Sequence, residues 1–171
     1  TGSQAGIVSD WLRANTIDGD ILQIGSGNWG VGGPSYLTST GIGPEAGNIV
    51  VQGAAVGGYG VEIARPVTSV DGDISFISAQ RILFSPYSEV STSGVGADAG
   101  TIHVTGSTIS MEATSSSLTT AAGDISLTAG GGLTSSIPIS FGGDLILDLA
   151  GTSSLTGPLD GAGSLLKTGA G

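Results

Sequence analysis

Two acidic triplets, Asp18-Gly19-Asp20 and Asp71-Gly72-Asp73, could hold a metal ion. Ca²⁺ prefers several oxygen ligands, and paired carboxylates beside a glycine turn can supply them. Aspartate is also common in turns, because its side chain accepts hydrogen bonds from the nearby backbone. Neither the Ca²⁺-binding nonapeptide repeat nor the spacing of an EF-hand loop is present. We favour the turn interpretation, expect no cofactor, and keep Asp18, Asp20, Asp71 and Asp73 as candidate Ca²⁺ ligands.

Nucleophilic catalysis would require the only histidine, His103, beside a serine and an aspartate. His103 lies between Ile102 and Val104, so strand alternation predicts that it points away from the core. The sequence has no nucleophile elbow, and Gly25-Ser26-Gly27 is typical of a glycine-rich corner. We therefore expect an exposed strand histidine and no catalytic residue.

Carboxylate-based cleavage of a polysaccharide is the alternative enzymatic function. Such enzymes need two carboxyl groups about 5–10 Å apart. Enzymes that act on acidic polymers also need basic groups, and Arg65 and Arg81 are the only cations in mid-chain. The net charge of −10 would repel an acidic polymer. We therefore expect a protein that is not an enzyme.

Four aromatic residues, Trp29, Tyr36, Tyr59 and Tyr87, lie in expected loops or near expected corners. Exposed aromatic rings beside glycines suit stacking on sugars or contact with a protein partner. The other interpretation is that they cover the ends of the fold or close the bases of loops. We take these four residues as candidate ligand-binding residues.

Runs of hydroxyl residues, such as Thr38-Ser39-Thr40 and residues 115–120, allow a third interpretation, which is ice binding. That function would need regular Thr-x-Thr rows on one flat face. The spacing here is irregular, so we favour ordinary solvated outer strands.

The elements that carry these residues follow from a phrase that returns every 20 to 28 residues: glycine, a small or polar residue, then apolar, any, apolar. It begins at Gly19, Gly47, Gly72, Gly100, Gly123, Gly143 and Gly163. Alternation predicts that Ile125 and Leu127 point inward, with Leu145, Leu147 and then Leu165 stacked on them. The glycines are expected to form corners with positive φ. A turn-plus-strand unit at this period predicts an all-β fold, a right-handed parallel β-helix of about seven coils over residues 17–171.

Residues 1–16 differ from the repeats. Ile7, Val8, Trp11 and Leu12 have helical spacing, which favours a short capping helix. An irregular first strand is the equal alternative. The longer stretches 25–43 and 85–100 are expected to be loops on one face, where binding groups usually lie.

Composition limits the partners. The chain has 171 residues, 39% of them hydrophobic, with no cysteine and only four Lys and Arg residues. Four scattered cations argue against binding to nucleic acid or to anionic membranes. No apolar stretch approaches the roughly 18 residues of a membrane helix, so we expect no membrane insertion. No signal peptide opens the sequence; it is absent or was removed.

The C-terminal stretch carries a family resemblance. Gly161, Gly163, Leu165, Lys167, Gly169 and Gly171 fit the phrase GxGxLxKxGxGxL, within residues 148–171. This segment resembles the autotransporter-associated β-strand repeat, found in passenger β-helices of bacterial autotransporters. Residues 123–130 are similar to repeats of filamentous-haemagglutinin-type exoproteins. The chain stops just before the apolar strand that normally follows, so we expect an unpaired edge at its last coil.

The resemblance implies a secreted or cell-surface bacterial protein associated with the outer membrane, and implies no catalytic residues. We expect a structural scaffold or adhesin that presents loops to a host or bacterial surface protein, a glycan or a neighbouring cell. End-to-end self-association is expected as well, because exposed strand edges recruit other edges.

Overall fold

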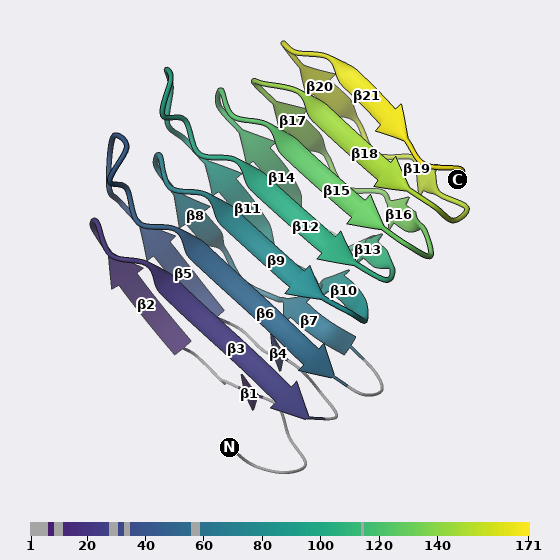
Figure 1. Ribbon diagram of the computed structural model, residues 1–171, viewed down its shortest axis with the longest axis horizontal. Coiled ribbons are helices and arrows are strands. Elements are labelled where there is room, and N and C mark those ends of the chain that lie inside the picture. Colours follow the sequence, from purple (N-terminus) through teal and green to yellow (C-terminus); the bar gives the residue numbers. More distant parts are fainter. Residues whose placement is uncertain (1–6, 9–11, 28–30, 33–34, 56–58, 114) are drawn as a thin grey trace.

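The computed structural model describes residues 7–8, 12–27, 31–32, 35–55, 59–113 and 115–171. Within these ranges the chain is all-β: 21 strands lie in three parallel sheets of seven strands each. Figure 1 shows the sheets wound into one β-solenoid. The predicted fold is confirmed.

Each sheet takes every third strand of the chain. The first sheet contains β1 (Ile7–Val8), β4 (Val31–Gly32), β7 (Tyr59–Ile63), β10 (Arg81–Phe84), β13 (Ile109–Met111), β16 (Leu133–Ser135) and β19 (Ser154–Leu155). The second contains β2 (Leu12–Thr16), β5 (Ser35–Ser39), β8 (Val67–Ser69), β11 (Glu89–Thr92), β14 (Ser117–Thr120), β17 (Ile139–Phe141) and β20 (Leu159–Gly161). The third contains β3 (Ile21–Gly27), β6 (Ile49–Ala55), β9 (Ile74–Ser78), β12 (Ile102–Gly106), β15 (Ile125–Ala129), β18 (Leu145–Leu149) and β21 (Leu165–Thr168).

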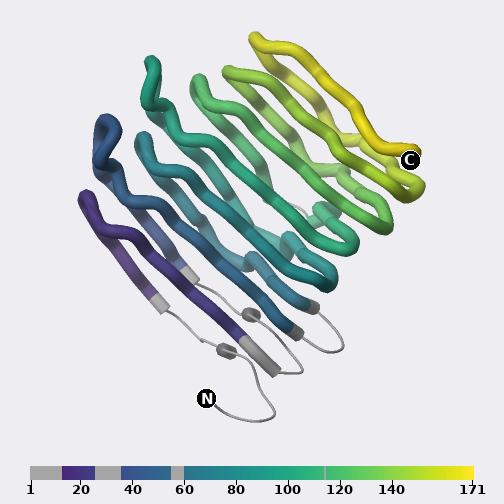
Figure 2. Tube along the Cα trace, viewed as in Figure 1, coloured from purple at the N-terminus to yellow at the C-terminus, as the bar shows by residue number. Residues whose placement is uncertain are grey.

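Three consecutive strands, one from each sheet, make one rung, from β1–β3 to β19–β21. In Figure 1 the third sheet faces the viewer, its strands run to the lower right, and the rungs advance to the upper right while the other sheets lie behind. This path is right-handed, as parallel crossovers nearly always are. The tube in Figure 2 shows the same path from the N-terminal to the C-terminal end.

Alternate residues of each strand fill the interior. In the third sheet, one inward file runs through Ile49, Ile74, Ile102, Ile125 and Leu145, each fully buried and in register. The next inward file includes Leu127 and Leu147, as predicted, and both side chains are buried. Leu165 continues the first file but is 56% exposed on the last rung. The predicted stack of aliphatic side chains is therefore present, and its last side chain is exposed to solvent.

The repeat glycines are needed for a reason that differs from the prediction. Among the described glycines, positive φ occurs at Gly43, Gly96, Gly132 and Gly169, and at none of the phrase glycines. Instead, a Cβ at Gly72 would overlap the carbonyl oxygen of Gly47, and one at Gly123 would overlap that of Gly100. The phrase glycines stack directly on one another, so close approach between rungs excludes a side chain there.

The predicted N-terminal capping helix is wrong. Residues 7–8 and 12–16 are strands β1 and β2, which pair with β4 and β5. They complete the first rung, in line with the strand alternative. No helix long and apolar enough to cross a membrane occurs in the described part of the chain.

Candidate functional site

Asp20 and Asp73 lie at the corner between the second and third sheets, where they join a ladder of hydrogen bonds. Asp20 Oδ1 accepts from the backbone nitrogen of Asn48 at 2.8 Å, and Asn48 Oδ1 accepts from that of Asp73 at 2.8 Å. Asp73 Oδ1 in turn accepts from the backbone nitrogen of Thr101 at 2.8 Å. Each side chain thus satisfies a backbone donor one rung further along.

The ladder returns further along the chain. Asp124 Oδ1 accepts from the backbone nitrogen of Asp144 at 2.7 Å, and Asp144 Oδ1 accepts from that of Ser164 at 2.8 Å. Five of the seven phrases therefore use the residue after the glycine as a carboxylate or amide acceptor. This is a structural use of the polar position.

Asp18 and Asp71, the first residues of the two triplets, both lie against the longer loop over residues 40–48, Asp18 from the rung before it and Asp71 from the rung after it. Asp71 Oδ2 accepts from the backbone nitrogen of Gly43 at 2.7 Å. Asp18 lies against Gly41, whose absent Cβ would be 3.0 Å from Asp18 Oδ1. Within the described ranges, no group of three or more His, Asp or Glu side chains gathers closely enough to hold a metal ion. Three of the four triplet carboxylates thus accept backbone hydrogen bonds from a neighbouring rung, and the Ca²⁺ site stays a prediction.

His103 is exposed on the outer face of β12, as predicted. Thr101 Oγ1 lies 2.8 Å from Asp73 Oδ1 and 2.8 Å from His103 Nε2. An ionised carboxylate only accepts, so the threonine hydroxyl donates to Asp73 and accepts from Nε2–H of the histidine. In this arrangement the threonine hydrogen is directed at the carboxylate and not at the imidazole.

The four candidate aromatic residues do not gather at one place. Trp29 lies outside the described residues, and Tyr59 begins β7 with its side chain outside what the structure describes. Tyr36 is half-buried in β5, and the Arg13 guanidinium carbon lies 5.0 Å from its ring centroid, a cation–π distance. Tyr87 is 61% exposed at the corner between the first and second sheets. Of the four, Tyr87 is thus the one whose ring is shown free to meet a ligand.

Tyr87 has an unusual backbone. Its φ is +71°, in a turn closed by a 3.3 Å hydrogen bond from the Ser88 nitrogen to the Ser85 oxygen. Proline precedes it, which is the arrangement of a type II turn, where glycine is usual at this position. Ser115, at the same corner one rung further along, has φ +60°. A non-glycine residue in this region costs roughly 1–2 kcal/mol, so the surroundings must hold both turns in place.

Two buried serines, Ser88 and Ser116, hold these turns in place through hydrogen bonds. The backbone nitrogen and hydroxyl of Ser88 both lie within hydrogen-bond distance of Ser116 Oγ, at 3.3 and 3.1 Å. Ser116 Oγ also donates to the Ser85 carbonyl oxygen at 3.2 Å. Both serines are buried. The strained corner is therefore tied from one rung to the next.

Two hollows open on the outer face of the first sheet, and one of them includes two residues of this turn. One, of about 450 Å³, is lined by Pro86, Leu83 and Ser85, and the other, of about 260 Å³, by Thr108, Thr134 and Thr152. Arg81, Ser110 and Glu112 line both. Ser110 Oγ lies 3.5 Å from Glu112 Oε2. Aliphatic, hydroxyl, cationic and anionic groups thus meet next to the turn that carries Tyr87, although Tyr87 itself lines neither hollow.

The chemistry of this corner suits binding. Glu112 is the one carboxylate that lines either hollow, whereas carboxylate-based glycoside cleavage uses a pair. Arg81 and Glu112 can hydrogen-bond sugar hydroxyls, and an exposed aromatic ring can stack on a sugar face. Sequence reasoning named Tyr87 but missed Arg81, Ser110 and Glu112, which come from two rungs. The sequence Ser85-Pro86-Tyr87-Ser88, typical of a turn, is a local signal that could have pointed to this place.

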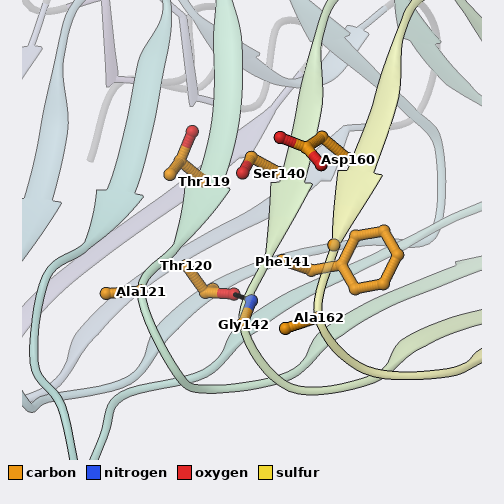
Figure 3. Close-up of a pocket in the computed structure, with 9 residues that line it drawn as sticks. Thr119, Thr120, Ala121, Ser140, Phe141, Gly142, Asp160 and Ala162 are labelled. Carbon is orange, nitrogen blue, oxygen red and sulfur yellow. Dashed lines mark hydrogen bonds between the residues drawn. The ribbon is translucent and has the colours of Figure 1, made fainter.

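A third hollow, of about 470 Å³, lies on the outer face of the second sheet. Figure 3 shows Thr119, Ser140 and Asp160 there on three neighbouring strands, with the Thr120 hydroxyl against the Gly142 nitrogen. The outward file continues through Ser91, Thr68 and Thr38 in register. The neighbouring outward positions hold Arg13, Tyr36, Glu89 and Ser117, so this face has one row of hydroxyls where ice binding would need two.

Comparison with known proteins adds nothing to this geometry. No protein-family model, curated protein or solved structure matches the chain.

Proposed function

We propose that this chain is a non-enzymatic segment of a secreted or cell-surface bacterial protein, a stiff scaffold whose Tyr87 corner binds a glycan. The observation that supports it is the strained, exposed Tyr87 in a turn whose Ser85 and Pro86 line one of two hollows, both of which Arg81, Ser110 and Glu112 also line. A tyrosine where the backbone favours glycine costs stability. Ligand binding by its exposed ring gives a functional reason for this loss of stability.

The scaffold part of the proposal draws on the regularity of the stack. The residues of the repeated phrase already have structural roles: they fill the core, stack as glycines between rungs, or accept hydrogen bonds from the next rung. Side chains free to meet a partner therefore belong to corners and outer faces. This division of labour is typical of repeat proteins, which present binding groups on a rigid solenoid.

Glycan-array binding with the purified chain tests the proposal. We expect wild type to bind a subset of glycans, and Tyr87→Ala and Glu112→Gln to lower that binding at least tenfold. Tyr87→Gly separates binding from stability, because it removes the ring and also relieves the positive φ; it should lose binding while its melting temperature is kept or raised. Tyr36→Ala is the matched control, an aromatic on the second sheet away from the Tyr87 turn, and should bind as wild type.

The enzymatic alternative is tested with the same material. Incubation with a panel of polysaccharides should release no reducing ends and no unsaturated products. Product release that disappears in Glu112→Gln would overturn the proposal in favour of an enzyme. Loss of binding in Tyr36→Ala alone would move the site to the second sheet.

A further inference from the structure

Two long loops at the corner between the second and third sheets have matching sequences. Residues 40–47 read Thr-Gly-Ile-Gly-Pro-Glu-Ala-Gly, and residues 93–100 read Ser-Gly-Val-Gly-Ala-Asp-Ala-Gly. We name residues 40–48 and 93–101 the twin loops. They belong to the rungs β4–β6 and β10–β12, and Figure 1 shows both extending beyond the neighbouring corners.

The twin loops have the same conformation. Gly43 and Gly96 both have positive φ, at +79° and +109°. A hydrogen bond closes the following turn in each: the Ala46 nitrogen donates to the Gly43 oxygen at 3.1 Å, and the Ala99 nitrogen to the Gly96 oxygen at 3.4 Å. The rung between them turns with the short segment 70–73, so the stack itself does not require such long corners.

Each loop presents the same pair of groups to solvent. Ile42 is 74% exposed and Val95 78% exposed. Three residues further along, Glu45 and Asp98 are exposed carboxylates. Both loops thus present an exposed aliphatic side chain and a nearby carboxylate on the same backbone conformation.

Asp71 contacts both of the twin loops. Its Oδ2 accepts from the Gly43 nitrogen of the first loop, and its Oδ1 occupies the space that a Cβ at Gly94, in the second loop, would need. The Gly94 nitrogen also donates to the Val70 oxygen at 2.9 Å. Both loops therefore pack against residues 70–71 of the rung between them.

The surrounding charge selects the partner. Eight of the 14 acidic residues and none of the four Lys and Arg residues lie in the segments of this corner: Asp18, Asp20, Glu45, Asp71, Asp73, Asp98, Asp124 and Asp144. Such an edge attracts a basic surface and repels an acidic one.

The spacing selects the shape of the partner. The loops are two rungs apart, about 10 Å at the spacing of neighbouring strands. Residues i and i+7 of an α-helix lie on one face about 10.5 Å apart. An extended strand instead repeats its face at about 6.7 or 13 Å, which fits poorly.

We propose that the twin loops form a two-point docking surface for a basic amphipathic helix of a partner protein, with aliphatic residues seven apart meeting Ile42 and Val95. Lys or Arg side chains of that helix meet Glu45 and Asp98. The proposal adds a protein partner to the proposed scaffold role, at a different corner from Tyr87.

An array of helical peptides of about 18 residues, long enough to form a helix, tests this with the purified chain. Peptides with leucines seven apart beside lysines should bind, and binding should weaken as salt is added. We expect Ile42→Ser and Val95→Ser each to weaken the Kd about tenfold and the double variant about a hundredfold. Glu45→Gln with Asp98→Asn should remove most of the salt dependence.

Leu166→Ser is the matched control, because this leucine is 52% exposed on the last rung, away from the twin loops. It should bind as wild type. The proposal is overturned if Leu166→Ser weakens binding as much as Ile42→Ser, if proline-interrupted peptides bind equally well, or if leucine spacing makes no difference. Glycan binding measured in parallel keeps the two proposals apart, since Ile42→Ser should leave it unchanged.

Discussion

Single oxygen atoms connect the rungs at the corner between the second and third sheets. Asp124 and Asp144 do this with a carboxylate, whereas Asn48 does it with an amide. The presence of Asn48 in the ladder indicates that an acceptor is needed there and a negative charge is not.

Asp124→Ala should therefore lower the free energy of unfolding by about 1–2 kcal/mol, because the backbone nitrogen of Asp144 loses its partner. Asp124→Asn should stay within about 0.5 kcal/mol of wild type, since the amide oxygen can replace the carboxylate. Urea denaturation of the three proteins measures both. If both variants lost the same free energy of unfolding, the negative charge of Asp124 and not its role as a hydrogen-bond acceptor would be what stabilises this corner.

The same geometry bears on calcium. Asp20 and Asp73 each commit an oxygen to the next rung, and Asp71 commits one to Gly43. We expect millimolar Ca²⁺ to leave the melting temperature unchanged, with Mg²⁺ as the control for ionic strength. A rise specific to Ca²⁺ that is lost in Asp18→Asn would instead assign a metal site to the triplets.

At the scale of the strand, β15 shows the alternation that carries the fold. Leu127 is fully buried and Ser126 is half-buried on the outer face. Leu127→Ala should cost about 2–5 kcal/mol of unfolding free energy, because it leaves a cavity in a continuous inward file. Ser126→Ala should change it by less than about 0.5 kcal/mol. Similar effects of the two changes in thermal and urea unfolding would contradict this register.

The glycine stack makes a second prediction about elements. A Cβ at Gly123 would overlap the Gly100 carbonyl oxygen, whereas one at Gly130 would have its nearest described neighbour at 4.0 Å. Gly123→Ala should therefore destabilise the protein by about 2–3 kcal/mol, as overpacking does. Gly130→Ala should be neutral or slightly stabilising, because alanine restricts the unfolded chain. Differential scanning calorimetry of the pair decides between close approach and simple glycine flexibility.

Periodicity predicted these elements well because alternation is a local property of each strand. Ile125 and Leu127 could be assigned to the core from their own phrase. The first rung could not be assigned this way, since Ile7 and Val8 have a spacing that suits a helix as well as a strand. Their pairing with Val31 and Gly32 decides the outcome, and that contact is not local.

The candidate sites were harder to predict for the same reason. Arg81 precedes Glu112 by a full rung, and only stacking brings them to the same hollow. The twin loops could have been found by comparing residues 40–47 with 93–100, but their shared packing against Asp71 depends on the fold.

At the scale of the whole molecule, stacking also places like charges together. Asp124 and Asp144 lie on neighbouring rungs, joined by a backbone hydrogen bond to the Asp124 carboxylate. Two unit charges about 5 Å apart repel by about 0.8 kcal/mol in water. Eight carboxylates along one corner, in a chain of net charge −10, should therefore oppose folding at low ionic strength.

Salt should relieve this repulsion. The Debye length falls from about 30 Å at 0.01 M to about 8 Å at 0.15 M, so NaCl screens the more distant pairs along the corner. We expect the melting temperature to rise by about 3–6 °C over this range, since about 1 kcal/mol corresponds to 2–4 °C for a chain of this size. The double variant Asp124→Asn with Asp144→Asn keeps the acceptors and removes two charges, so its rise should be smaller. A melting temperature that falls with NaCl would mean that attractive ion pairs outweigh the repulsion along this corner.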